Sequence, residues 1–406
     1  MFAWECAALL ALLLLVPVLP QTHHKTEAAA PTTGWYAGPR NSPTTLGRVI
    51  VVDSRWFGDP PGGVEAMIQL SIALAAATSR DEVFVSGYGG LSYNEKWKRA
   101  YGDKLVTKVR AISDLKRGDI VFFNEGMGCS HGPANVPEGV FVYIYLLAAY
   151  RGCKDAKMHF ISHNHYLLNF ENLHLPKERL IHPYLNENFT YMAHLRGLQH
   201  DGSISFNKMR YKSKKRNLIL VDDDVPESVK RMIVMAAESS GGKALVLTGL
   251  NNEQLIDAYE SAKMATDWCM RGSERCMLEA SLFGALVTTN RCETGSDFQD
   301  LPIPAKFIYN HTDDSALHSD AKNEELYNSS SPLYQRLLAD LMHVVSHGFS
   351  NYWDLVDDYE PLRRSILSHN PSSMVRESVR FLSSHGLSQD MLGQLHGGQG
   401  SKCVGC

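Results

Sequence analysis

The segment 267–304 constrains the fold of this chain more than any other, because it combines a tight turn, a helix and a buried strand. Residues 263–268 have the pattern of a strand, and Gly272 and Ser273 follow in a turn, with Ser273 as an N-cap candidate. Apolar residues then recur at helical spacing as far as a C-capping glycine, before the β-branched strand 286–289. This order predicts one unit of a parallel sheet, with a helix N-terminus at the carboxyl edge of its strands.

The string G-S-E-R-C-M-L-E-A-S-L-F-G-A-L-V-T-T-N in this segment resembles the donor-binding segment of glycosyltransferases with the GT-B fold. The resemblance implies that Glu279 hydrogen-bonds the ribose of a nucleotide sugar, and that Gly272, Ser273 and Arg275 lie near its diphosphate. These residue types suit that chemistry, since a carboxylate accepts from a diol and a guanidinium at a helix N-terminus attracts phosphate. Arg275 and Glu279 are four residues apart, so they share one face of the helix.

Two other glycine turns fit the same resemblance. Gly62 and Gly63 follow the first buried strand and precede a helix, as at the opening of GT-B transferases, where the backbone approaches the cleft. Gly295 and Asp297 resemble the turn beside the donor sugar, where Asp297 and Asp300 are able to accept hydrogen bonds from sugar hydroxyls.

The rest of the chain alternates strands and helices, which predicts an α/β fold of two Rossmann-like doubly wound domains facing a cleft, with C-terminal helices. Ligands of open parallel sheets bind beyond the carboxyl ends of the strands, so Glu125 and His163 are candidate general bases. His163 and His165 stand two apart without an evident third ligand, and no metal site is predicted there. The predicted strands are 48–53, 82–86, 119–124, 140–147, 159–162, 180–183, 217–221, 243–248, 263–268 and 286–289.

The predicted organisation has seven parts. These are a signal peptide or signal anchor (1–20), a stem (21–46), an N-terminal acceptor domain (47–200), a linker (201–216), a C-terminal donor domain (217–330), C-terminal helices (331–390) and a disordered tail (391–406). Six Lys and Arg residues between 208 and 216 are interpreted as a solvated linker. The tail holds Cys403 and Cys406, whose spacing would suit a metal or redox pair, although a disordered tail is the preferred interpretation.

The N-terminal residues predict entry into the secretory pathway. Residues 7–19 form an apolar run that is short for a membrane span of about 20 residues and typical of a signal sequence. Glycosylation sequons at Asn188, Asn310 and Asn328 agree with this address. We therefore expect the protein in the lumen of the ER or Golgi, membrane-anchored or not, or secreted. The net charge of −4 gives no support for nucleic-acid binding.

These observations predict a glycosyltransferase that uses a nucleotide sugar as co-substrate, needs no cofactor or metal, and acts on a glycan, protein or lipid acceptor. One alternative is a metal-dependent transferase, because Asp222 and Asp224 have the D-x-D spacing that holds Mn²⁺ or Mg²⁺ with a donor diphosphate. Another is a non-catalytic binding protein of the same fold. It is favoured by Arg271, which stands where the family commonly has a glutamate, and by the lack of an evident Arg and Lys pair for the phosphates.

Overall fold

The structure is a computed structural model that describes residues 49–52, 62–78, 83–86, 108–109, 115–124, 139–147, 159–169, 174–198, 204–268, 270, 275–309 and 328–384. The expected signal segment, stem and C-terminal tail lie outside these residues, as do Glu125, Gly272 and Ser273. Among the described helices, none has the length and apolar character needed to cross a membrane.

The first sheet contains six parallel strands in the order β3-β2-β1-β4-β5-β6. Because β1 pairs with both β2 and β4, the direction of winding reverses between β1 and β4, which is where ligands of doubly wound sheets bind. The strands are β1 (Val49–Val52), β2 (Val83–Ser86), β3 (Lys108–Val109), β4 (Ile120–Asn124), β5 (Phe141–Leu146) and β6 (His159–Ser162).

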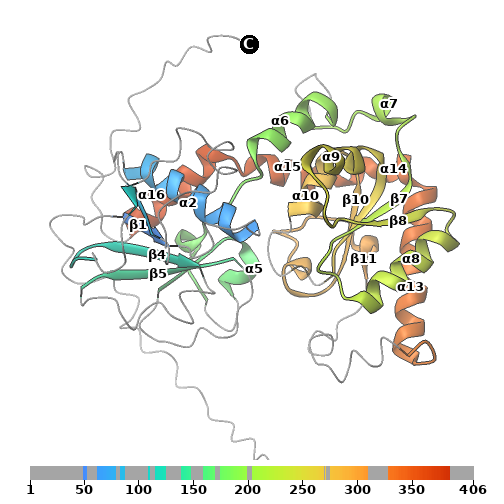
Figure 1. The fold of residues 1–406 in the computed structure, drawn as a ribbon, viewed down its shortest axis with the longest axis horizontal. Coiled ribbons are helices and arrows are strands. Elements are labelled where there is room, and N and C mark those ends of the chain that lie inside the picture. The colour runs from blue at the N-terminus through green and yellow to red at the C-terminus, as the bar shows by residue number, and fades with distance from the viewer. Residues whose placement is uncertain are drawn as a thin grey trace, which may run out of the picture. The chain divides into compact units, whose positions relative to one another are not determined.

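Both faces of this sheet are buried, as is usual for parallel sheets. On one face, Phe122 and its neighbours pack against helices α2 (Gly62–Thr78) and α16 (Pro371–Ser384), which lie side by side in Figure 1. The alternate residues Val121 and Ile144 belong to a separate cluster on the other face. The near-continuous apolar strands of the sequence therefore reflect burial on both sides.

The second sheet contains five parallel strands in the order β11-β10-β9-β7-β8. Its winding reverses between β7 and β9, whose carboxyl ends lead to Asp222 and Asp267 respectively. The strands are β7 (Arg216–Val221), β8 (Lys243–Val246), β9 (Ala262–Thr266), β10 (Leu286–Asn290) and β11 (Ile308–Tyr309).

Four longer helices accompany the second sheet, and Figure 1 shows α8 and α13 beside each other. Helix α13 also packs on β9, where a Cβ atom on Gly348 would lie 2.4 Å from the sulfur of Met264. Glycine at that crossing lets the helix backbone approach the strand closely, and a larger residue would displace the end of the Met264 side chain. The helices are α8 (Glu227–Ser239), α9 (Asn252–Ser261), α10 (Arg275–Leu282) and α13 (Pro332–Ser350).

The predicted fold class is confirmed: two Rossmann-like parallel sheets are followed by C-terminal helices. The C-terminal helices pack near both sheets: α13 packs on the second sheet, and α16 packs on α2 beside the first. The other described elements are α5 (His165–Leu168), η5 (Lys177–Arg179), α6 (Glu187–Arg196), α7 (Lys208–Tyr211), η6 (Glu293–Ser296), η7 (Ala305–Phe307), α14 (Tyr352–Leu355), η8 (Val356–Tyr359) and α15 (Glu360–Ser368).

Two local predictions are wrong. The strand expected at 180–183 is reduced to a single parallel bridge between Ser162 and Leu180. The basic segment expected to be solvated includes Lys215, which is buried and donates from Nζ to the carbonyl oxygens of Tyr259 (2.9 Å) and Ala262 (2.5 Å). Those carbonyls lie at the C-terminal end of α9, where a lysine satisfies acceptors that the helix leaves open.

Candidate functional site

A cavity of about 100 Å³ is lined by residues that follow strands of both sheets. Gly63 and Glu65 come from the first turn of α2, and His163 follows β6. Arg275 begins α10, and Asp300 lies in the loop after β10. The cavity therefore lies where parallel sheets place ligands, at the carboxyl ends of their strands.

Arg275 is held between two buried carboxylates. Its guanidinium pairs with Glu65 from α2 and, at 2.9 Å, with Glu279 on the next turn of α10. The side chain of Arg275 is 30% exposed, whereas those of Glu65 and Glu279 are 3% and 2% exposed. The spacing of Arg275 and Glu279 in the sequence thus predicts their shared helix face correctly.

Both carboxylates have additional donors. The Tyr259 hydroxyl donates to Glu279 at 3.1 Å, and the Asn186 side-chain amide donates to Glu65 at 3.1 Å. Two buried carboxylates around one guanidinium leave a formal negative charge, so these hydrogen bonds help to stabilise the group. Arg275 is the most exposed of the three charged side chains, and as the cation among them it is the one able to meet an anionic ligand.

Of the other glycine and aspartate residues predicted for the donor site, Gly63 and Asp300 line the cavity, whereas Gly295 and Asp297 are not among its described lining residues. Glu279 is not a lining residue either and reaches the cavity only through its ion pair with Arg275. Gly62 and Gly63 begin α2. Gly295 lies in η6, where a Cβ atom would come within 2.7 Å of the Asn290 carbonyl oxygen. Asp297 ends the same turn, and its carboxylate accepts from the backbone amide of Gln299 at 2.8 Å.

His163 lines the cavity but is almost fully buried. Its Nδ1 lies 2.8 Å from the Leu146 carbonyl oxygen, which can only accept, so Nδ1 carries the proton and Nε2 is the basic atom. Burial lowers the pKa of His163 to about 4, and the ring is therefore neutral at pH 7.

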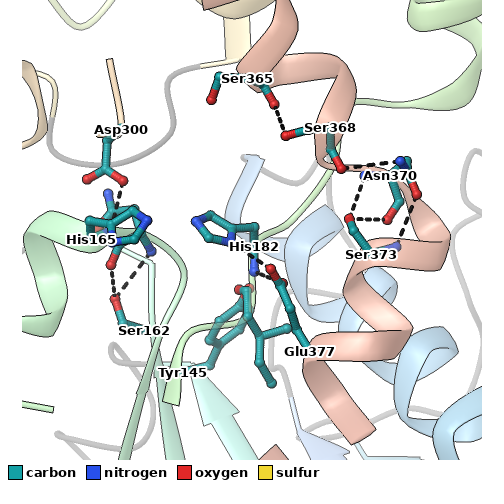
Figure 2. Close-up of polar contacts among 12 residues, drawn as sticks. Tyr145, Ser162, His165, His182, Asp300, Ser365, Ser368, Asn370, Ser373 and Glu377 are labelled. Carbon is teal, nitrogen blue, oxygen red and sulfur yellow. Dashed lines mark hydrogen bonds and ion pairs between the residues drawn. The ribbon is translucent and has the colours of Figure 1, made fainter. Parts of the chain in front are cut away.

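A cluster of histidines and carboxylates that the sequence pattern does not reveal forms another part of the site, and Figure 2 shows it. His165 and His182 face each other with ring centroids 5.5 Å apart, and His369 stacks on His182 at 4.1 Å. Asp300 lies beside His165, and Glu377 of α16 binds His182. These residues are far apart in the chain, and the sequence indicated a role only for Asp300, as an acceptor from sugar hydroxyls.

Three aspartates meet at the winding reversal of the second sheet. Carboxylate oxygens of Asp222, Asp224 and Asp267 lie within 4.8 Å of one another. Burial and the nearby charge of Asp224 raise the pKa of Asp222 to about 6. The D-x-D spacing noted in the sequence is thus joined by a third carboxylate from β9, a partner that spacing alone could not predict.

Comparison with known proteins yields similarity only to solved structures: no family model and no curated protein matches the chain. The chain is similar to AviGT4, a glycosyltransferase involved in avilamycin A biosynthesis, with 13% identity, coverage of 80% of this chain and 98% of that chain, and a TM-score of 0.38. It is also similar to the DNA-modifying enzyme β-glucosyltransferase, solved with and without uridine diphosphoglucose, with 10% identity, coverage of 78% and 100%, and a TM-score of 0.32. Both likenesses concern the fold.

Proposed function

We propose that this protein is a glycosyltransferase that transfers a sugar from a nucleotide-sugar donor to an acceptor hydroxyl. The observation that carries the proposal is the position of Arg275. Its partly exposed guanidinium lies at the start of α10, in a cavity of mixed polar and apolar lining at the carboxyl ends of the strands of two Rossmann-like sheets. A guanidinium at a helix N-terminus is suited to stabilise the diphosphate that leaves when the sugar is transferred.

The remaining donor contacts follow from the resemblance noted in the sequence. Glu279 would accept from the ribose hydroxyls, Gly62 and Gly63 would let the backbone approach the donor, and Gly295 and Asp297 would lie beside the sugar. Glu279 is engaged by Arg275 and Tyr259, so ribose binding requires these contacts to rearrange.

Donor binding also requires the cavity to open. Pockets for small molecules usually measure about 300–1,000 Å³, whereas this cavity measures about 100 Å³. The ion pair between Glu65 and Arg275 joins the two sides of the cavity. We infer that the donor diphosphate replaces Glu65 as the partner of Arg275.

The acceptor hydroxyl requires a general base, for which Glu125 and His163 are the candidates. A base works best with a pKa near the operating pH. The lowered pKa of His163, about 4, makes it a weak base at pH 7. An ordinary glutamate has a similar pKa of about 4.3, so basicity alone does not select between the two candidates. The acceptor is a glycan, protein or lipid, and its class is left open in this proposal.

A second candidate function is a metal-dependent transferase, because Asp224 and Asp267 join Asp222 at the winding reversal of the second sheet. We prefer metal-independent donor binding, since Arg275 already supplies a positive charge for the diphosphate. Donor affinity, measured by calorimetry separately from transfer, should then survive EDTA. The metal-dependent alternative would be supported if chelation removed donor affinity and Mn²⁺ restored it. Mn²⁺ should then fail to restore donor affinity in Asp222→Asn.

We also propose that the protein acts in the secretory pathway. Cys292 is disulfide-bonded, as suits an oxidising compartment, and Asn328 is an exposed sequon residue. Protein from its native cells should shift to a lower mass on treatment with an N-glycosidase, and Asn328→Gln should remove part of that shift. An unchanged mass together with cytosolic fractionation would contradict this location.

Thermal shift against a panel of nucleotide sugars tests the function directly. A donor at a hundredfold excess over its Kd stabilises the folded state by about 2.7 kcal/mol. The expected result is stabilisation by one nucleotide class, with slow hydrolysis of the same donor. Stabilisation without hydrolysis or transfer would favour the non-catalytic binding protein, and no stabilisation by any nucleotide sugar would refute the proposal.

A further inference from the structure

Three side chains, His165, His182 and Asp300, lie close together, as Figure 2 shows, and two of them, His182 and Asp300, line the cavity. Asp300 is also expected to accept hydrogen bonds from the donor sugar, whereas the two histidines have no part in the donor contacts or the base proposed above. We propose that these three side chains form a binding site for a divalent transition-metal ion, and that Zn²⁺ fits the ligand set best. This site does not depend on the glycosyltransferase proposal.

The three ligand atoms are close enough to share an ion. One atom from each side chain lies within 4.8 Å of the others. Zinc binds histidine nitrogen and carboxylate oxygen at about 2.0–2.2 Å, so ligand atoms in a tetrahedral site lie about 3.3–3.6 Å apart. The ligand atoms therefore need to approach one another by at most about 1.5 Å, which side-chain rotations achieve.

His182 is held in the orientation that a metal ligand needs. Glu377 accepts hydrogen bonds from the His182 backbone amide at 2.7 Å and from the ring Nδ1 at 3.0 Å. An ionised carboxylate can only accept, so Nδ1 carries the proton and Nε2 keeps its lone pair. A carboxylate on the far nitrogen of a histidine is the usual support of a metal-bound imidazole. His369 stacks on the ring with an interplanar angle of 11° and restricts its rotation further.

Asp300 is also fixed before any ion binds. Its two oxygens accept from the backbone amides of His165 and Tyr166, each at 2.8 Å, at the start of α5. Each oxygen has a second lone pair, so these bonds leave room for a metal.

The ligand types select the ion. Two imidazoles and one carboxylate suit Zn²⁺ and its neighbours, whereas Mg²⁺ and Ca²⁺ prefer sites made of oxygen only. The all-carboxylate group of Asp222, Asp224 and Asp267 is of the latter kind and is a different site. Three protein ligands leave a fourth position for a water or substrate oxygen, whose pKa the ion would lower. His182 and Asp300 line the cavity, so that position is accessible to a ligand there.

The test is metal binding by the full chain, with rival sites removed. Cys403→Ser and Cys406→Ser remove a thiol pair that could hold zinc in the purified protein. In this background, metal-stripped protein is titrated with ZnCl₂ alone, and bound zinc and melting temperature are measured. His182→Gln and Asp300→Asn are the test variants. His343→Gln is the matched control, because His343 is an exposed histidine that stacks on His347 in α13 and could bind zinc on the surface.

The expected result is one tightly bound zinc per chain and a melting temperature that rises with zinc. Both should be lost in His182→Gln and Asp300→Asn and kept in His343→Gln. Glu377→Gln should weaken zinc affinity by about tenfold to a hundredfold, because it removes only the support of His182. Zinc binding that is absent, or unchanged in the test variants, would overturn the proposal. If a variant fails to fold, the visible spectrum of Co²⁺ bound to the unmutated site decides, since it must show nitrogen ligation and be displaced by Zn²⁺.

Because zinc binding is measured without any nucleotide sugar, its outcome is separate from that of the donor screen. Zinc binding without donor binding would leave the metal site standing and refute only the transferase. Donor binding without zinc would refute only the metal site.

Discussion

Replacing Glu279 with alanine tests the donor site at its most buried charged contact. Glu279 is 2% exposed and accepts hydrogen bonds from Arg275 and from the Tyr259 hydroxyl. If the donor site is as proposed, Glu279 both orients Arg275 and accepts from the ribose. A hydrogen bond to a charged group contributes about 1.5–3 kcal/mol, so donor affinity should fall by about tenfold to a hundredfold in Glu279→Ala. Glu279→Gln, which keeps one acceptor, should lose less.

The same change also destabilises the fold, and a control must separate the two effects. Glu279→Ala leaves the buried Tyr259 hydroxyl without this acceptor and Arg275 with one carboxylate fewer, at a cost of about 2–4 kcal/mol. Glu260 has a similar environment, but its partners do not line the cavity: it is 6% exposed and accepts from the Tyr211 hydroxyl at 3.1 Å and from Lys214 at 2.6 Å.

Calorimetric titration of donor and urea unfolding are therefore measured for Glu279→Ala and Glu260→Ala together. Both variants should lose comparable stability, and only Glu279→Ala should lose donor affinity. Equal donor affinities in the two folded variants would show that Glu279 has a purely structural role, and the assigned donor site would be refuted.

Two further predictions concern charge in and near the cavity. Glu65→Gln should raise donor affinity by about threefold to tenfold, because it removes a carboxylate that competes with the diphosphate for Arg275; a lower affinity in calorimetry would show that Glu65 helps the donor instead. Asp222 has a raised pKa of about 6 against an ordinary 3.8, so the folded state binds the Asp222 proton more tightly than the unfolded state does. The protonated carboxyl therefore contributes to the free energy of unfolding below about pH 4, and this contribution is lost as pH rises through 6. Asp222→Asn should therefore be more stable than the parent protein by about 1–3 kcal/mol at pH 7.5 and by much less at pH 4, and urea unfolding curves that show no such dependence on pH would contradict the assigned cause.

Much of the fold could be predicted from local patterns in the sequence. Apolar strands flanked by turns mark the two sheets, and burial on both faces is the reason that strands such as β4 lack alternation. The helical spacing of Arg275 and Glu279 is another local property, because the period of the α-helix alone places them on one face. The strand predicted at 180–183 is only a single bridge in the structure and shows the limit of this reasoning. A short apolar stretch pairs as a strand only where a neighbouring strand continues beside it.

The tertiary structure decided which of these local features meet. Nothing near Arg275 in the sequence indicates Glu65, and nothing near His165 indicates His182, Asp300 or the Glu377 that supports it. Lys215 looks like part of a solvated basic segment, yet it is buried because the end of α9 presents open carbonyl groups to it. Local periodicity depends on backbone geometry within a few residues. The charged groups named here become partners only when the sheets and the C-terminal helices pack. Burying a charge without a partner costs free energy, so the packed structure is one in which each buried charge has a partner.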